Sequence, residues 1–345
     1  MKWNVFGMLL TLAALIAAPL VIAGAWSGNF GQKPQQNDEY RLEGPFTHGN
    51  LSVFLVHGKD KIKGQTFLTL EEALIQKKVV VRETRTVNEL AIENLSNEEV
   101  YVQSGDIVKG GQQDRMLVVD LILPPRSGAI KIGAYCVEHG RWSQRGNEAA
   151  GVFGSSANTV ASRDVKLAAK LKSSQTEVWR EVSVAQEKLS SNVGGAVTNN
   201  DSPSSFQLTL ENKAVQQTAD DYLKSLAGII DGKPDVIGYV FAINGKVNSA
   251  DVYASSALFK KLWPKLLKAS AIEAVAELRR DEKFAPPSTE DVRGLLDDSK
   301  GEEKQKDVTS RVQVITRESS SNVSFETRDR AKADAWVHKN YIKKN

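Results

Sequence analysis

The chain has 345 residues, of which 41% are hydrophobic and 25% are charged. These proportions are typical of a globular protein with a buried core, and they exclude global disorder. The formal net charge is only +3, and no basic block is interleaved with aromatic residues, so we expect no nucleic-acid partner. The 4 histidines show no paired spacing and there is a single cysteine, which argues against a structural zinc site. We therefore expect no metal and no cofactor.

The N-terminus has the pattern of an export signal. Lys2 precedes an apolar run at 5–22, and the small residues Ala23-Gly24-Ala25 follow it. We expect a signal peptide over 1–25 and a flexible N-terminus over 26–40, which makes the mature protein periplasmic or secreted. The alternative is an uncleaved membrane anchor, because about 20 apolar residues can cross a bilayer. That segment is the only contact with a membrane that we expect.

The first half of the remaining chain is rich in β patterns. Apolar and β-branched runs predict strands at 51–56, 79–81, 89–94, 100–103, 116–123 and 129–137. The last two runs flank a turn with two prolines and a glycine at 124–128, so they predict a hairpin. A short helix is expected at 69–74, where Thr69 can cap the first turn. This half predicts an antiparallel sheet or sandwich.

The middle of the chain predicts helices. The stretch 155–162 is small and polar, and we expect a loop there. Ser174 and Glu177 have the spacing of a capping box. The helix that they open has an apolar face made of Val178, Val182, Ala185 and Leu189. A mobile loop at 190–205 leads to a second helix at 211–226, with an apolar stripe of Val215, Ala219, Tyr222 and Leu226.

The last third returns to β structure. Asn244-Gly245 is the preferred pair for a type I′ turn and predicts a hairpin of strands at 236–243 and 246–253. A helix at 255–278 should bend or break at Pro264. The segment 281–307 is dense in charge and has no apolar face, so we expect a solvated linker or insertion. Further strands are expected at 308–316, 323–327 and 335–342.

These elements predict one α+β domain over 41–343. Its antiparallel β core should be sandwich-like, receive an inserted helical segment in the middle and close with a C-terminal β meander.

Two polar blocks, 105–115 and 136–142, flank the predicted hairpin of 116–123 and 129–137. If the two strands pair, their open end brings the blocks together. We therefore expect a polar pocket built from Asp106, Gln112, Asp114, Arg115, Cys136, Glu138 and Arg141, with Trp142 at its rim. The arginines would hold an anionic or carbonyl group, and Gln112 would orient it.

Glu138 continues the apolar row of the second strand, so its carboxylate needs a partner. Arg115 or Arg141 could supply one with two parallel hydrogen bonds. Such a pair is either a structural contact that closes the end of the sheet or the setting of a general acid or base. Both alternatives stay open.

Cys136 also has more than one interpretation. A lone thiol in an exported protein is a packed core residue, an intermolecular bridge or a nucleophile. His139 lies three residues later, which would place it on the opposite face of a strand.

Gly110-Gly111 indicates either a bulge or turn, or a phosphate cradle completed by Arg115. A hard cation held by Asp106, Asp114 and Glu138 is a further alternative.

The two blocks resemble the bacterial ARPP-1 family, the ARG and rhodanese-phosphatase-superfamily-associated protein domain. Matches to the first block are Gly105, Asp106, Val108, Gly110, Gly111, Gln112, Gln113, Asp114 and Arg115, and matches to the second are Cys136, Val137, Glu138, Gly140, Arg141 and Trp142. Further matches are Gln175, Val178-Trp179, 242–246, Asp251 and 337–342. The likeness spans 51–342, which implies that the late strands belong to the same domain and that the charged segment is an insertion.

The family is a domain of unknown function, so the resemblance implies a domain rather than an activity. We expect a ligand-binding or interaction module, whose partner is a small molecule or a protein. The alternative is a hydrolase-like enzyme with Glu138 as acid or base, with or without Cys136.

Overall fold

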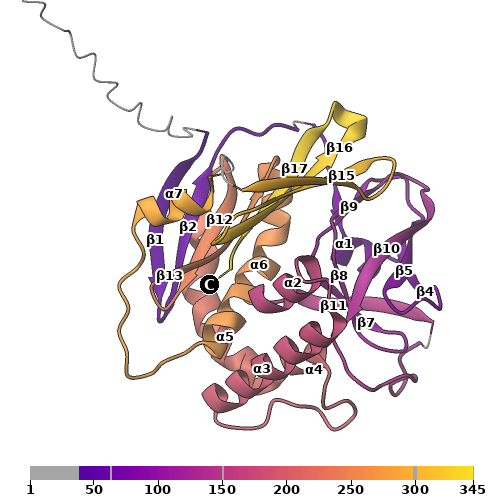
Figure 1. Ribbon diagram of the computed structural model, residues 1–345, viewed down its shortest axis with the longest axis horizontal. Helices are drawn as coiled ribbons and strands as arrows, with labels where there is room; N and C mark the ends of the chain where they lie inside the picture. The colour runs from indigo at the N-terminus through magenta and orange to yellow at the C-terminus, as the bar shows by residue number, and fades with distance from the viewer. Residues whose placement is uncertain (1–38, 63, 150, 298–300, 345) are drawn as a thin grey trace, which may run out of the picture. The chain divides into compact units, whose positions relative to one another are not determined.

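A computed structural model describes residues 39–62, 64–149, 151–297 and 301–344 (Figure 1). The signal peptide expected over 1–25 lies outside the described residues, as does the flexible N-terminus up to residue 38. Among the described helices, none combines the length and the apolar character needed to cross a membrane.

The described strands form an open sheet, a closed barrel and a small third sheet (Figure 1). The open sheet is antiparallel throughout and has the order β1 (Arg41–His48), β2 (Leu51–His57), β12 (Val236–Ile243), β13 (Lys246–Tyr253), β17 (Ala335–Lys343), β16 (Asn322–Asp329), β15 (Val312–Glu318) and β14 (Glu302–Asp307). The barrel has the order β10 (Gly128–Cys136), β5 (Glu89–Asn94), β4 (Val79–Glu83), β11 (Val152–Val160), β7 (Asp106–Gly110) and β8 (Arg115–Leu117). The third sheet joins β3 (Leu68–Thr69), β6 (Val100–Val102) and β9 (Leu121–Leu123). The predicted α+β class with an antiparallel β core is confirmed.

The helices are α1 (Leu70–Ile75), α2 (Arg163–Lys170), α3 (Gln175–Val193), α4 (Phe206–Leu210), α5 (Lys213–Leu226), α6 (Ser256–Ala276) and α7 (Thr289–Leu295). Four of them, α2 to α5, form the helical segment that was expected in the middle of the chain. Helix α6 contacts both β12 of the open sheet and β11 of the barrel, so it links the two β structures. It is continuous through Pro264 rather than interrupted.

Several local predictions are confirmed by their stabilising contacts. Asn244 and Gly245 both have positive φ, as a type I′ turn requires, and they join β12 to β13. The Ser174 hydroxyl accepts the N–H of Glu177 at the start of α3. The expected stripe of α5 is fully buried, from Val215 to Leu226.

Strand β2 is buried on both faces, as its unbroken apolar run allows. Leu51, Val53 and Leu55 lie in the core that contains the side chains of α5 and α6, whereas Phe54 and Val56 lie in a second core. Helix α7 supplies Val292 and Leu295 to that second core.

The charged segment at 281–307 therefore has more structure than the solvated linker that we expected. Helix α7 buries two of its residues, Val292 and Leu295. Because charged residues surround them in the sequence, this short apolar face was not predicted. The end of the segment forms β14, which pairs with β15 while all six of its residues remain exposed.

Two further expectations are wrong. The stretch 155–162 is not a loop, because most of it belongs to β11, which pairs with β4 and β7 and closes the barrel. A strand can be held by its backbone hydrogen bonds alone. The small and polar residues of this stretch lack the apolar, β-branched pattern from which a strand is predicted. The run at 116–123 is also not one strand: β8 stays in the barrel beside β10, and β9 leaves to pair with β6.

Helix α3 continues into the stretch that we expected to be a mobile loop, and it ends at Val193 before Gly194, whose φ is 75°. The short helix α4 was not expected at all.

Candidate functional site

The two polar blocks meet, as the predicted hairpin required. In the register of β8 with β10, Arg115 lies opposite Cys136 and Met116 opposite Tyr135. Just beyond the strands, the N–H of Val137 donates to the carbonyl of Asp114 at 3.0 Å. The structure nevertheless divides the expected pocket residues among three environments.

Asp106 is separate from the other expected pocket residues. It begins β7, and the polar blocks meet beyond the other end of that strand. Its Oδ1 lies 2.5 Å from Nζ of Lys265 on α6, and its Oδ2 accepts the N–H of Gln103 at 3.1 Å. Both members of the Asp106–Lys265 pair are buried, so this is an internal ion pair between the barrel and α6.

The second environment is a buried group that we call the ion-pair cluster: Asp114, Glu138, Arg141 and Arg145, with Ser202 and Ser205. Glu138 is completely buried. Its Oε1 accepts Nε of Arg141 at 2.6 Å, and its Oε2 accepts Nη2 of the same side chain at 2.8 Å. The N–H of Asp114 also donates to Oε2, at 2.9 Å, and the Ser202 hydroxyl donates to Oε1.

Asp114 has an equally complete set of partners. Nη1 and Nη2 of Arg145 each lie 3.0 Å from one of its carboxylate oxygens. The Ser205 hydroxyl donates to Oδ2 at 2.7 Å, and the N–H of Gly110 donates to Oδ1 at 2.9 Å. Burial alone would lower the pKa of Arg145, but its hydrogen bonds to Asp114 and Glu148 raise the pKa above its ordinary value.

The ion-pair cluster also explains the paired glycines. Arg141 donates from Nη2 to the carbonyl of Gly110 at 3.2 Å and from Nη1 to that of Gly111 at 3.1 Å. Both glycines have positive φ, which favours glycine over other residues. Because the N–H of Gly110 already donates to Asp114, these contacts favour the turn over the phosphate cradle.

Helix α3 holds the second polar block in place. The amide of Gln175 accepts the N–H of Cys136 at 2.9 Å and donates to its carbonyl at 2.8 Å. Nε1 of Trp179 donates to the carbonyl of Glu138 at 3.1 Å. Gln175 and Trp179 match the family pattern outside the two polar blocks, and these hydrogen bonds give both residues a structural role.

The third environment is one end of the barrel, which we call the barrel mouth: Glu83, Gln113, Arg115, Cys136 and Trp142. Leu117 and Ala134 lie in the barrel core. Because side chains alternate along a strand, Arg115 and Cys136, each two residues away, share that inner face. By the same alternation Glu83 follows the inward-facing Val81 on β4.

Arg115 is 1% exposed, yet it is loosely held. Its Nη1 lies 3.3 Å from both the carbonyl and the side-chain oxygen of Gln113, and its Nη2 lies 3.7 Å from Oε2 of Glu83. Its Nε has no hydrogen-bond partner among the described residues, and the same holds for Nε2 of Gln113. Trp142 is 51% exposed, and its ring lies 6.0 Å from Cζ of Arg115.

Cys136 is fully buried at the barrel mouth. Burial raises the pKa of its thiol, although the positive charge of Arg115 acts in the opposite direction. These surroundings favour the packed thiol over the nucleophile. Gln112 is exposed, and only its backbone N–H takes part, donating to Oε1 of Glu83 at 3.1 Å.

The sequence did not lead us to predict one buried network, which we call the His338 network. Nδ1 of His338 lies 2.8 Å from Oδ2 of Asp120, and its Nε2 lies 3.0 Å from Oδ1 of Asp251. The Tyr253 ring stacks on the imidazole at 4.4 Å. Burial lowers the pKa of His338, but attraction to the two carboxylates outweighs this and raises it.

The family resemblance contained the signal for this network, since Asp251 and His338 both match the family pattern. Their separation of 87 positions kept them from being joined as one cluster. The network links β13 and β17 of the open sheet to the segment between β8 and β9.

Among the described residues, no group of three or more histidine, cysteine, aspartate or glutamate side chains is arranged to hold a metal ion.

Comparison with known proteins gave one result. Neither the search of curated proteins nor the search of solved structures found a match. The family model described as ARG and Rhodanese-Phosphatase-superfamily-associated Protein domain matches residues 39–342, which is nearly the whole chain. The chain therefore belongs to the ARPP-1 family.

Proposed function

We propose that this chain is an exported ligand-binding module, and that the barrel mouth binds a small anion such as a carboxylate. The observation that carries the proposal is the pair of buried N–H donors without partners, Nε of Arg115 and Nε2 of Gln113. The proposal of export is supported by the sequence pattern of residues 1–25.

Unpartnered donors in a protein interior are uncommon because each costs about 1–3 kcal/mol. A ligand with two acceptor oxygens would remove this cost at both donors at once. It would also complement the charge of Arg115, whose nearest carboxylate, on Glu83, is 3.7 Å away. Ligands often bind in the mouths of β-barrels, where few polar groups set the orientation.

The contacts give no support to the hydrolase alternative. Both carboxylate oxygens of Glu138 already accept hydrogen bonds, from Arg141 and Ser202. Cys136 is buried, and the pKa of its thiol is raised. A general acid or base must reach the proton that it transfers, and a nucleophilic thiol must ionise.

The test is an anion titration that follows tryptophan fluorescence, because Trp142 lies over Arg115. Acetate, phosphate and sulfate are added at constant ionic strength. We expect saturable binding by the wild-type protein. Replacing Arg115 with glutamine should weaken binding about 10- to 100-fold, the value of a charge-assisted hydrogen bond.

Arg126→Gln is the matched control, because Arg126 is an exposed arginine on the turn before β10. Trp142→Phe should remove the optical signal while calorimetry still detects binding. Equal titrations of the wild-type and Arg115→Gln proteins, or no saturation with any of the three anions, would contradict the proposal. Export is tested separately: the intact mass of protein recovered from outside the cytoplasm should correspond to cleavage near Ala25.

A further inference from the structure

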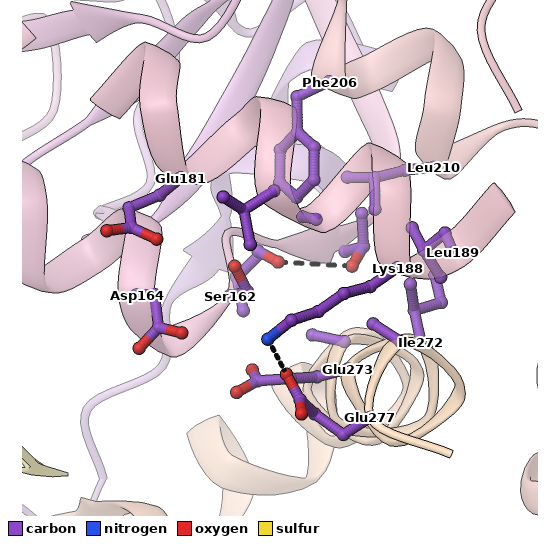
Figure 2. A pocket seen from close by; sticks show the side chains of 16 residues that line it. Ser162, Asp164, Glu181, Lys188, Leu189, Phe206, Leu210, Ile272, Glu273 and Glu277 are labelled. Atoms are coloured by element: carbon purple, nitrogen blue, oxygen red, sulfur yellow. Dashed lines mark hydrogen bonds and ion pairs between the residues drawn. The ribbon is translucent and has the colours of Figure 1, made fainter. Parts of the chain in front are cut away.

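A groove separate from the barrel mouth lies between α2, α3, α4 and α6 (Figure 2). Apolar side chains form much of its wall, among them Leu189, Phe206, Leu210 and Ile272. A wall of this kind suits the apolar part of a ligand.

The charged residues of the groove are mostly acidic. Asp164, Glu181, Glu273 and Glu277 line it, against a single lysine, Lys188. Figure 2 shows Lys188 reaching from α3 toward Glu277 on α6, and its Nζ lies 2.5 Å from Oε1 of that residue. The one lining ammonium group is therefore already paired.

Two of the other carboxylates also have cationic neighbours outside the groove. Oδ1 of Asp164 lies 2.9 Å from Nε of Arg163. Oε1 of Glu181 lies 2.7 Å from Nη2 of Arg180.

Glu273 differs from these three acids. It accepts the side-chain amide of Asn248 at 2.8 Å and the backbone N–H of Arg163 at 3.1 Å. Among the described residues it forms no ion pair within 4.0 Å, although it lines the groove. Burial raises the pKa of its carboxyl group, which reflects the cost of a desolvated charge, whereas the more distant charge of Arg163 lowers it.

We propose that this groove binds an organic cation, namely a primary amine attached to an apolar group. The ammonium group pairs with Glu273, and the apolar group lies against the side chains of α3, α4 and α6. A partly buried carboxylate is stabilised by an opposite charge with good geometry, and among the charged residues that line the groove Glu273 is the one without an ion-pair partner. This site is independent of the anion site proposed at the barrel mouth.

The test compares three probes of matched length by calorimetry: hexylamine, hexanol and hexanoate. We expect hexylamine to bind most tightly and hexanoate most weakly. Glu273→Gln keeps the length of the side chain and an oxygen for Asn248, and it should reduce the affinity for hexylamine about 10- to 100-fold. Affinity for hexanol should change little.

Glu187→Gln is the matched control, because Glu187 is an exposed acid on α3 that does not line the groove. A second variant, Ala185→Phe, fills the groove without changing charge and should abolish binding of all probes. Its thermal melting curve, and that of Glu273→Gln, shows whether each variant is folded. Equal affinities for hexylamine and hexanoate, no binding of hexylamine, or unchanged binding in either groove variant would overturn the proposal.

Discussion

Asp114 and Arg115 are neighbours in sequence, yet they belong to two different kinds of buried polar site. Asp114 belongs to the ion-pair cluster, where Arg145 reaches it through two contacts of 3.0 Å. Arg115 belongs to the barrel mouth, where its shortest hydrogen bonds are 3.3 Å long and one donor has no partner. Arg115 and Arg145 are both buried, so burial alone does not distinguish the two sites.

The difference lies in how completely the polar groups are satisfied. A buried network whose donors and acceptors all have partners rigidifies a protein, and removal of one member leaves a charge uncompensated. A buried donor without a partner is a defect in the folded protein unless something else satisfies it. We therefore assign a structural role to the ion-pair cluster and propose a binding role for the barrel mouth. Two substitutions test this distinction, and a third tests the His338 network.

The largest effect is expected for Glu138→Gln. The change keeps the shape of the side chain but removes the charge that compensates Arg141, and breaking a buried pair typically costs about 3–5 kcal/mol. The free energy of unfolding in urea measures this loss. Glu93→Gln is the control, because Glu93 pairs with Arg82 at the surface and should contribute about 1 kcal/mol or less. A loss no larger than that of the control would remove the structural role of the cluster.

An intermediate effect is expected for His338→Gln, and it depends on pH. The pKa of His338 is raised in the folded protein, so its contribution to stability is complete below the unfolded value of about 6.5 and is lost as the pH rises through the folded value. Each unit of the shift corresponds to about 1.4 kcal/mol. The variant should therefore lack this decline in the free energy of unfolding on the alkaline side.

Other groups of the His338 network titrate in their own ranges. The pKa values of Asp120 and Asp251 are lowered: burial opposes this change, and attraction to His338 contributes to it in both. Their contribution is present above about pH 3.9 and is lost as the pH falls further. Lys170, whose Nζ donates to Oδ1 of Asn340 at 3.2 Å, titrates as well. Burial lowers its pKa to about 8, so the free energy of unfolding rises with pH between about 8 and the unfolded value of about 10.4. The readout is thus the difference between the wild-type and variant curves, with His139→Gln as an exposed control; parallel curves would contradict the prediction.

The smallest effect on stability is expected for Arg115→Gln. The lost contacts are long, and glutamine removes a guanidinium group that the fold does not fully satisfy, so the free energy of unfolding should change by about 1 kcal/mol or less. Urea unfolding in the absence of added anions measures it. If Arg115→Gln destabilised the protein as much as Glu138→Gln, the two sites would not differ and the barrel mouth would be a second structural cluster.

Local patterns predicted much of the fold and part of the site. The Asn244-Gly245 turn and the stripe of α5 depend on neighbouring residues, and both were predicted correctly. The meeting of the polar blocks followed from one strand pairing, between β8 and β10.

What could not be predicted depends on contacts between distant segments. Arg145, Ser202 and Ser205 complete the ion-pair cluster from loops without a regular pattern. Asp106 was placed in the pocket because it shares a block with Asp114, but a strand of about 3.3 Å per residue separates the two ends of β7. Its partner Lys265 belongs to α6, more than 150 positions away.

The last strand of the open sheet, β14, also bears on how this molecule behaves beside other copies of itself. A terminal strand offers backbone donors and acceptors to any extended chain that approaches it. Here the sequence Glu302-Glu303-Lys304-Gln305-Lys306-Asp307 covers that border with five charged side chains and one amide, all exposed to water. An incoming strand would have to strip water from these charges, which opposes fibre-like stacking at this border and helps the protein stay dispersed at high concentration.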